Sequence, residues 1–160
     1  MQLSGDIRIE RPIDEVFAAW SALERSSEYS DAIVERRQLT EGPVGTGTRY
    51  HAVDKWPGRE VEFTVEVTRF DAPRQMSATW SEPVTGTWEA AFEESGAGTV
   101  LRFSSTIEPS GLTGLLSPLL RPWASRQLKS FLADFRTWVE ADRHTPDPAE
   151  SADPGVAGSG

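Results

Sequence analysis

The feature that most constrains how this chain can fold is a series of short alternating segments between residues 32 and 108. Residues 60–67, EVEFTVEV, alternate strictly between polar and apolar side chains, which is the pattern of a strand with one buried face. Short links rich in glycine and proline separate the segments, and such links join antiparallel strands because a parallel crossover needs about a dozen residues. The pattern predicts strands over about 32–40, 47–56, 60–71, 74–82, 84–94 and 98–108.

The residues before this series predict one more strand and two short helices. Alternation over about 2–10 predicts the strand, and Pro12 ends it and suits a first helical turn. From Ile13 an apolar face at i, i+3, i+4 and i+7 predicts an amphipathic helix that buries Trp20. A second short helical piece is expected over about 22–29.

The last predicted element is a long helix, because apolar residues recur at helical spacing from 128 to 139. The segment before it, SGLTGLLSPLLRPW at 110–123, is also apolar, but its stripe points in another direction. Pro118 and Pro122 interrupt it, so we expect an irregular lead-in, with Ser117 and Pro118 as the cap and first turn of the helix. This lead-in either packs against the sheet edge or gates an interior site.

Composition restricts the partners and the compartment. The net charge of −9 argues against nucleic acid and against an anionic membrane surface, both of which favour clustered Lys and Arg. The lack of cysteine excludes disulfides, a thiol nucleophile and cysteine-ligated zinc. No apolar run approaches the roughly eighteen residues of a membrane span, and the first residues do not resemble a signal peptide. We therefore expect a cytoplasmic protein with no stable membrane association.

The end of the chain differs in composition from the rest. Residues 144–160, HTPDPAESADPGVAGSG, combine prolines, acids and small residues with almost nothing to bury, which predicts a disordered tail. The remaining residues, 1–143, have the length of a single domain and contain no internal repeat.

This order of elements is typical of the α+β helix-grip fold. Four stretches carry a closer resemblance: IRIERPIDEVFAAW at 7–20, GPVGTGTRY at 42–50, VTRFDAPRQMSATW at 67–80 and LLRPWASRQLKSFLADFRTWVE at 119–140. They resemble one superfamily with that fold, the START-related polyketide cyclase/dehydrase and lipid-transport proteins (SRPBCC). The resemblance implies a curved seven-stranded antiparallel sheet wrapped around the long C-terminal helix, with an apolar cavity between them. Members hold lipids, sterols, hormones or polyketides there, and a minority catalyse cyclisation or dehydration. Because the superfamily has no shared catalytic motif, the resemblance predicts the fold better than the activity.

The glycine-rich stretch GPVGTGTRY raises the alternative of a phosphate-binding loop. It has the spacing G-x-G but no third glycine, no lysine and no following helix, so neither a dinucleotide site nor a P-loop is indicated. We expect Gly45 and Gly47 to supply positive φ or a bulge at a turn that leads into a strand.

Few residues are candidates for catalysis. His51 and Tyr50 are weak candidates for a lone acid–base group, and only one of these neighbours can face the interior. Asp54 lies three positions from His51 along the strand, so the two cannot form a dyad. We predict no metal and no cofactor, because one core histidine and no cysteine leave only carboxylates as ligands. Glu89 and Arg102 are expected to form a surface ion pair worth under about 1 kcal/mol.

Apolar side chains of one strand parity, together with the helix, are expected to line a ligand cavity. Aromatic walls with few polar groups are typical of ligand pockets, and the indoles of Trp80 and Trp88 are expected to offer N–H donors to a ligand oxygen. The predicted ligand-binding residues are Phe63, Val65, Met76, Trp80, Trp88, Phe92, Leu101, Phe103, Leu120, Trp123, Leu128 and Phe131.

We therefore expect a protein, monomeric or weakly dimeric, that binds a small hydrophobic molecule of lipid-like, aromatic or polyketide-like character. No arrangement of residues demands catalysis, so enzymatic activity is left open. One alternative is a polyketide cyclase or dehydratase in which His51 or Tyr50 moves protons. A second alternative is a protein-interaction module, which would have a filled core and an exposed apolar patch.

Overall fold

The computed structural model describes residues 1–108 and 112–141, with side chains described outside 112–117. Within these residues the strands form a seven-stranded antiparallel sheet in the order β1-β7-β6-β5-β4-β3-β2. The strands are β1 (Gln2–Ile9), β2 (Ile33–Gln38), β3 (Arg49–Trp56), β4 (Arg59–Asp71), β5 (Gln75–Ser81), β6 (Thr85–Ser95) and β7 (Gly98–Glu108). The predicted meander is confirmed, and β1 forms one edge of the sheet by pairing with β7.

Two of the hairpins have two-residue turns, which fix the register of their strands. Trp56 pairs with Arg59 and Ser95 pairs with Gly98, so only two residues lie between the paired ends of β3 and β4 and of β6 and β7. Such turns need positive φ, which glycine adopts without strain. Gly58 and Gly96 have φ values of 83° and 59°.

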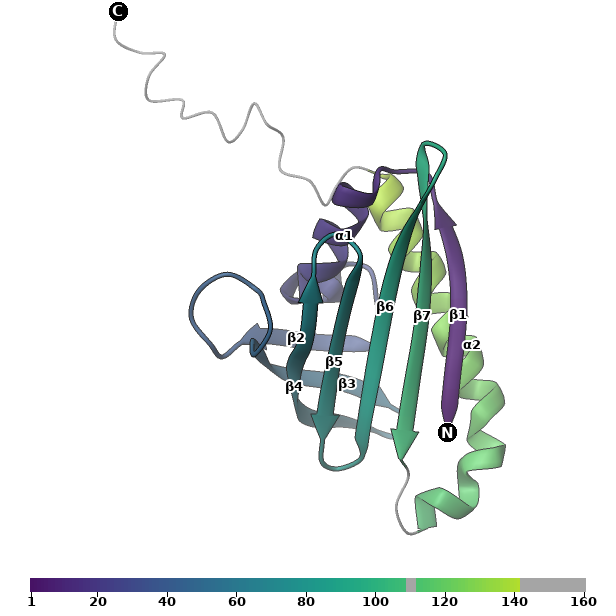
Figure 1. Cartoon of the computed structure of the whole chain (residues 1–160). Helices are drawn as coiled ribbons and strands as arrows, with labels where there is room; N and C mark the ends of the chain where they lie inside the picture. Colours follow the sequence, from purple (N-terminus) through teal and green to yellow (C-terminus); the bar gives the residue numbers. More distant parts are fainter. Residues whose placement is uncertain (109–111, 142–160) are drawn as a thin grey trace, which may run out of the picture.

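The helices of the described part are α1 (Ile13–Ser21), the 3-10 helix η1 (Leu23–Glu28) and α2 (Leu112–Glu140). Figure 1 shows α2 running along β1, while α1 and η1 lie near one end of the curled sheet. We call the face of the sheet toward α1 and α2 the inner face. One core cluster joins side chains of α1, α2 and the inner face, as expected for a helix-grip fold. The prediction of residues 144–160 as a tail lies outside the described residues.

Polar contacts connect the turn after β1 to the last turn of α2. Glu10 donates its backbone N–H to Oε1 of Glu140 at 3.2 Å, and the Arg11 guanidinium donates to the backbone carbonyl of Glu140. Pro12 follows as the N-cap of α1, and its carbonyl accepts the N–H of Val16 at 3.1 Å. These contacts hold the start of α1 beside the end of α2, so the apolar face of α1 is directed between the helix and the sheet.

The prediction of an irregular lead-in before the long helix is wrong. The helix α2 begins at Leu112 and contains both Pro118 and Pro122, so Ser117 lies within the helix instead of capping it. A proline inside a helix removes one backbone hydrogen bond and bends the helix without always ending it. Figure 1 shows α2 changing direction toward its N-terminal end.

The glycine-rich stretch 42–50 is a turn that leads into β3, as predicted, but the glycines with positive φ are not the predicted pair. Gly42 and Gly47 have φ values of 91° and 93°, whereas Gly45 does not have positive φ. Gly45 instead donates its N–H to Oγ1 of Thr48 at 2.9 Å and accepts the Thr48 N–H at 3.1 Å. The Thr48 hydroxyl therefore closes the turn, which short side-chain contacts to the backbone commonly do.

The predicted ion pair between Glu89 and Arg102 does not form. Both residues are exposed, but the register places Glu89 opposite Ser104 and Arg102 opposite Ala91. Nη1 of Arg102 instead lies 2.6 Å from Oε2 of Glu93. Both side chains are more than half exposed, so this pair contributes less than about 1 kcal/mol.

Close packing of an indole against a glycine gives a first prediction. A Cβ added to Gly86 would lie 2.0 Å from Cζ2 of Trp80, its cross-strand partner, so only glycine leaves room for this ring. We expect Gly86→Ala to displace Trp80 and to lower the free energy of unfolding by about 1–3 kcal/mol, measured by urea denaturation.

Gly45→Ala is the matched control for that substitution. Nothing lies within 4 Å of a Cβ at Gly45 and its φ is not positive, so we expect its stability to be unchanged or slightly raised. Equal destabilisation by the two substitutions would contradict the packing argument.

Candidate ligand-binding site

The inner face of the sheet and the two α-helices enclose an aromatic cluster centred on Trp20 of α1. The Trp20 side chain is buried, and its ring lies 5.1 Å from the ring of Phe135 and 5.9 Å from that of Phe131, both on α2. From the sheet, Trp88 and Phe103 approach it at 5.8 Å and 5.7 Å. Most of these contacts are edge-to-face, which is the favoured geometry for aromatic pairs. The cluster fills the centre of the interior.

Six of the predicted ligand-binding residues, four on the inner face and two on α2, are apolar but only partly buried, and three of them also contact Trp20. Trp88 stacks on Phe103 with ring centroids 6.2 Å apart, and Phe63 lies 6.4 Å from Trp80. A ligand held between the sheet and α2 would contact these partly buried apolar side chains. We call this group the accessible rim; it consists of Phe63, Trp80, Trp88, Phe103, Leu128 and Phe131.

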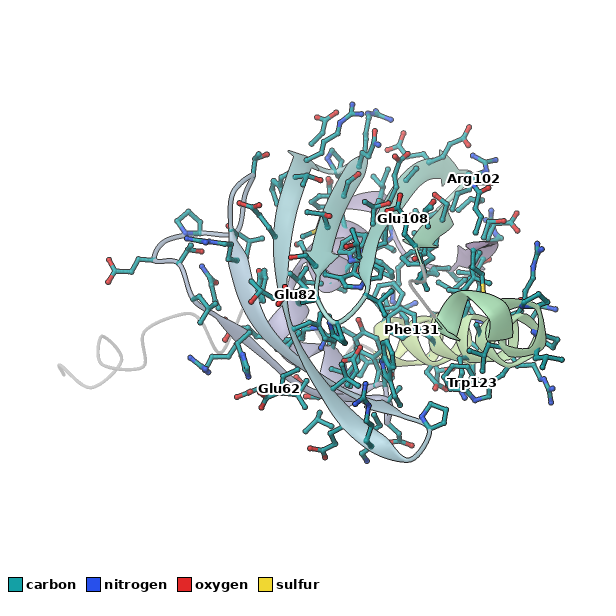
Figure 2. All side chains as sticks on the ribbon, turned by 90° about the horizontal axis from the view of Figure 1, so that it is seen from below. Glu62, Glu82, Arg102, Glu108, Trp123 and Phe131 are labelled. Carbon is teal, nitrogen blue, oxygen red and sulfur yellow. The ribbon has the colours of Figure 1, made fainter. Side chains whose placement is uncertain are left out.

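The other residues of the predicted set lie in two different environments. Leu120 and Trp123 are 37% and 40% exposed and are not among the residues that pack on the core. Figure 2 shows Phe131 between α2 and the sheet, whereas Trp123 lies at the outer side of the helix. The remaining predicted residues belong to the packed core and are Val65, Met76, Phe92 and Leu101.

The two adjacent candidates for acid–base chemistry point to opposite faces of β3. Tyr50 faces inward and is fully buried. His51 pairs with Arg37 and Thr64 on the outer face, where its Nε2 lies 3.5 Å from Oε2 of Glu35. Burial raises the pKa of Tyr50 to about 12, with a smaller contribution from Glu24. Tyr50 therefore stays protonated at neutral pH and can donate a hydrogen bond, whereas His51 is directed away from the interior.

Two buried hydrogen-bond donors in this interior have no acceptor among the described residues. They are the indole Nε1 of Trp20 and the hydroxyl of Tyr50. A buried polar group without a hydrogen-bond partner destabilises the folded protein by about 1–3 kcal/mol. Such groups are therefore rare unless a ligand or water supplies the hydrogen bond. Sequence reasoning assigned the donor role to Trp80 and Trp88 and missed Trp20. The buried helical face that was predicted to contain Trp20 is the signal that could have identified it.

The sequence analysis also did not predict an ion pair on the inner face. Nη1 of Arg36 on β2 lies 2.6 Å from Oδ1 of Asp54 on β3, and the two side chains are 12% and 22% exposed. The Arg36 guanidinium also lies over the ring of Phe63, 5.4 Å from its centroid. A register shift between Ile33 and Glu35 changes which side chains of β2 point to the inner face. Simple alternation along the sequence therefore does not predict the face on which Arg36 lies.

The described residues also show what surrounds the site. They contain no group of three or more His, Cys, Asp or Glu side chains that could hold a metal ion. Two surface hollows that they form are lined by other residues, among them Glu62 and Glu82 in one and Glu10 and Arg136 in the other. Figure 2 shows Glu62 and Glu82 on the strand side of the molecule, away from α2. None of the described helices is long and apolar enough to cross a membrane.

The family of the chain follows from a match over most of its length. Residues 1–140 match the family described as "Polyketide cyclase / dehydrase and lipid transport". The chain belongs to this family. A comparison with curated protein sequences finds no match.

Solved structures resemble this family member at low sequence identity and agree on the fold. TTHA0849 from Thermus thermophilus has a TM-score of 0.78 and 20% identity, covering 89% of this chain and 99% of that one. Ara h 8.0201 has a TM-score of 0.67 and 16% identity, covering 88% and 98%. The di-domain ARO/CYC StfQ from the steffimycin biosynthetic pathway has a TM-score of 0.68 and 16% identity, covering 87% of this chain and 44% of that one.

The unpartnered hydroxyl gives a prediction for this member of the polyketide cyclase/dehydrase and lipid-transport family. Tyr50→Phe removes a buried polar atom that makes no hydrogen bond to the described residues and leaves the ring in place. We expect the free energy of unfolding of the ligand-free protein to rise by about 1 kcal/mol, measured by urea denaturation.

Thr99→Val provides the opposite case for comparison. Thr99 is equally buried, but its hydroxyl donates to the carbonyl of Arg11 at 2.8 Å, so removing it should destabilise the protein by about 1 kcal/mol. Destabilisation by Tyr50→Phe would mean that this hydroxyl has a partner after all.

Proposed function

We propose that the protein binds a small hydrophobic molecule between the inner face of the sheet and α2, against the accessible rim. The observation that carries the proposal is the pair of buried donors, Trp20 Nε1 and Tyr50 OH, that lack an acceptor among the described residues of an otherwise apolar interior. A ligand oxygen would satisfy either donor. Family membership supports the proposal, since the family comprises lipid transport as well as cyclase and dehydrase proteins.

The rim and the donors support one kind of ligand. Four of the six rim residues carry large aromatic rings on the sheet, and Phe131 adds another from α2, so flat ring systems would be favoured. Each Å² of apolar surface removed from water contributes roughly 25 cal/mol, which provides most of the affinity. The donors would fix the orientation of a ligand that carries at least one acceptor oxygen.

Tyr50 also supports a second candidate function, a cyclase or dehydratase activity. A protonated, buried phenol with no partner among the described residues can donate to a substrate carbonyl and stabilise negative charge that develops there. In this mechanism His51 has no part, because it lies on the outer face. Turnover of a poly-β-ketone that Tyr50→Phe slows by about a hundredfold, with binding retained, would favour catalysis over simple binding.

Removing one rim indole tests the proposed site. We expect the uncharged fluorescent probe N-phenyl-1-naphthylamine to bind the full chain saturably and with 1:1 stoichiometry. Trp88→Ala removes a ring that stacks on Phe103, so its affinity for the probe should fall about tenfold, or about 1.4 kcal/mol.

Trp123→Ala is the control, since Trp123 is 40% exposed and does not pack on the core. We expect it to leave the affinity for the probe unchanged. Failure of the probe to bind, together with failure to detect any bound apolar molecule by native mass spectrometry, would overturn the proposal. Equal losses from both substitutions would place the site elsewhere.

A further inference from the structure

Two neighbouring arginines on β2 differ sharply in their surroundings. Arg37 lies on the outer face with its side chain 58% exposed and its Nε 3.6 Å from Oε1 of Glu35. Arg36 lies on the inner face opposite Ala52 of the core, and its side chain is only 12% exposed. Removing most of a guanidinium from water costs free energy unless other groups hydrogen-bond to it.

Only one nitrogen of the Arg36 guanidinium donates hydrogen bonds to the described residues. Nη1 donates to Oδ1 of Asp54 at 2.6 Å and to the backbone carbonyl of Glu35 at 3.0 Å. Nε and Nη2 make no hydrogen bond to the described residues. A guanidinium presents five N–H donors in a rigid planar fork, so the Nε–Nη2 edge is left with two parallel donors and no acceptor in the described part of the chain.

The position of the guanidinium connects Arg36 to the proposed ligand site. The guanidinium lies over the ring of Phe63, which belongs to the accessible rim, with Cζ 5.4 Å from the ring centroid. Tyr50, with its unpartnered hydroxyl, is opposite Gln38 and therefore one diagonal step from Arg36 on the same face. The positive charge of Arg36 also offsets part of the rise in the pKa of Tyr29 that burial causes.

Two parallel N–H groups beside an aromatic ring match one kind of acceptor best. The two oxygens of a carboxylate accept both hydrogen bonds at once, and charge assistance makes each bond stronger than the bond to a neutral carbonyl. Asp54 fixes the plane of the fork and neutralises much of its charge, and Glu24 acts on the neighbouring Tyr50. These acids limit the attraction for an anion, so the preference should be moderate.

We infer that Arg36 is the polar anchor of the ligand site and that the ligand is an apolar ring compound that carries a carboxylate. This inference rests on the proposed function and adds the chemical class of the ligand to it. The Nε–Nη2 edge of Arg36 binds the carboxylate, the Tyr50 hydroxyl donates to a further oxygen, and the rim packs against the ring system. Asp54 acts as a positioning residue that holds the guanidinium and does not itself touch the ligand.

A matched series of ligands tests the charge preference separately from apolar binding. 2-Naphthoic acid, 2-naphthamide and 2-ethylnaphthalene would each displace N-phenyl-1-naphthylamine from the full chain in a competition titration. We expect the acid to bind the wild-type protein about tenfold more tightly than the amide. Arg36→Lys keeps the charge that Asp54 needs but lacks the fork, so this variant should lose most of that preference while still binding the neutral probe.

Arg37→Lys is the control on the same strand and should retain the full preference for the acid. If Arg36→Lys does not fold, Arg36→Gln combined with Asp54→Asn removes both charges and should give equal affinities for acid and amide. Equal affinities of the wild-type protein for acid and amide, or a preference for the acid that persists in Arg36→Lys, would overturn the inference. If the probe still binds, the proposed function is retained. Failure of the probe and of all three compounds to bind would overturn both.

Discussion

Trp20→Ala is expected to lower the free energy of unfolding by about 3–5 kcal/mol, which is the usual cost of truncating a fully packed aromatic side chain. The side chain is 3% exposed, and its ring contacts rings from both the sheet and α2. Because Trp20 is the point at which α1, the sheet and α2 meet, its removal leaves a cavity that no single neighbour can fill. Urea denaturation followed by far-UV circular dichroism measures the effect without relying on tryptophan fluorescence.

Trp123→Ala serves as the comparison, because Trp123 is 40% exposed and should cost less than about 1 kcal/mol. A loss of similar size for the two tryptophans would show that the aromatic cluster is not the centre of the core. If the cavity left by Trp20→Ala admits a small aromatic molecule such as benzene, binding should restore part of the lost stability.

Asp54→Ala is expected to lower the free energy of unfolding by about 3 kcal/mol, because it leaves the Arg36 guanidinium, whose side chain is only 12% exposed, without its carboxylate. The pair is short, at 2.6 Å, and the Arg36 side chain is only 12% exposed, so water would replace the missing acceptor only in part. The cost arises mainly from the charge that remains and less from the attraction that is lost. Urea denaturation at two salt concentrations would measure it.

Asp71→Ala provides the matched surface case. Nη2 of Arg69 lies 3.8 Å from Oδ2 of Asp71, and both side chains are more than half exposed, so removal of this carboxylate should cost under about 1 kcal/mol. Replacing Arg36 and Asp54 together by Gln and Asn should recover part of the stability that Asp54→Ala loses, because no buried charge remains. Equal, small effects of the two aspartate substitutions would mean that solvent reaches Arg36.

These predictions share a physical theme, which is that the inner face retains donors whose partners are not all supplied by the described residues. Tyr50→Phe should stabilise the ligand-free protein while weakening the binding of ligands with an acceptor oxygen. A substitution that raises stability and lowers affinity at the same position is the expected signature of a group kept for binding. The exposed donors of Arg37 would not show this behaviour, since water satisfies them.

The fold was predictable from sequence because the signals for it are local. Alternation within segments such as β4 depends only on which side chains are polar, and short links determine that neighbouring strands are antiparallel. The same alternation placed the rim residues Phe63, Trp80, Trp88 and Phe103 on the inner face. Helical spacing placed Leu128 and Phe131 toward the sheet, whereas Leu120 and Trp123 precede the stretch where α2 packs on the core.

What the sequence by itself determined is therefore the order of elements, the antiparallel meander and most of the apolar face. The tertiary structure alone decided which of Tyr50 and His51 faces inward and that Arg36 lies mostly out of solvent beside Asp54. It also decided that α2 continues through Pro118 and Pro122. The physical reason is that these outcomes depend on the register between strands and on packing across the interior. Such contacts join residues far apart in the chain and leave no periodic pattern in the sequence.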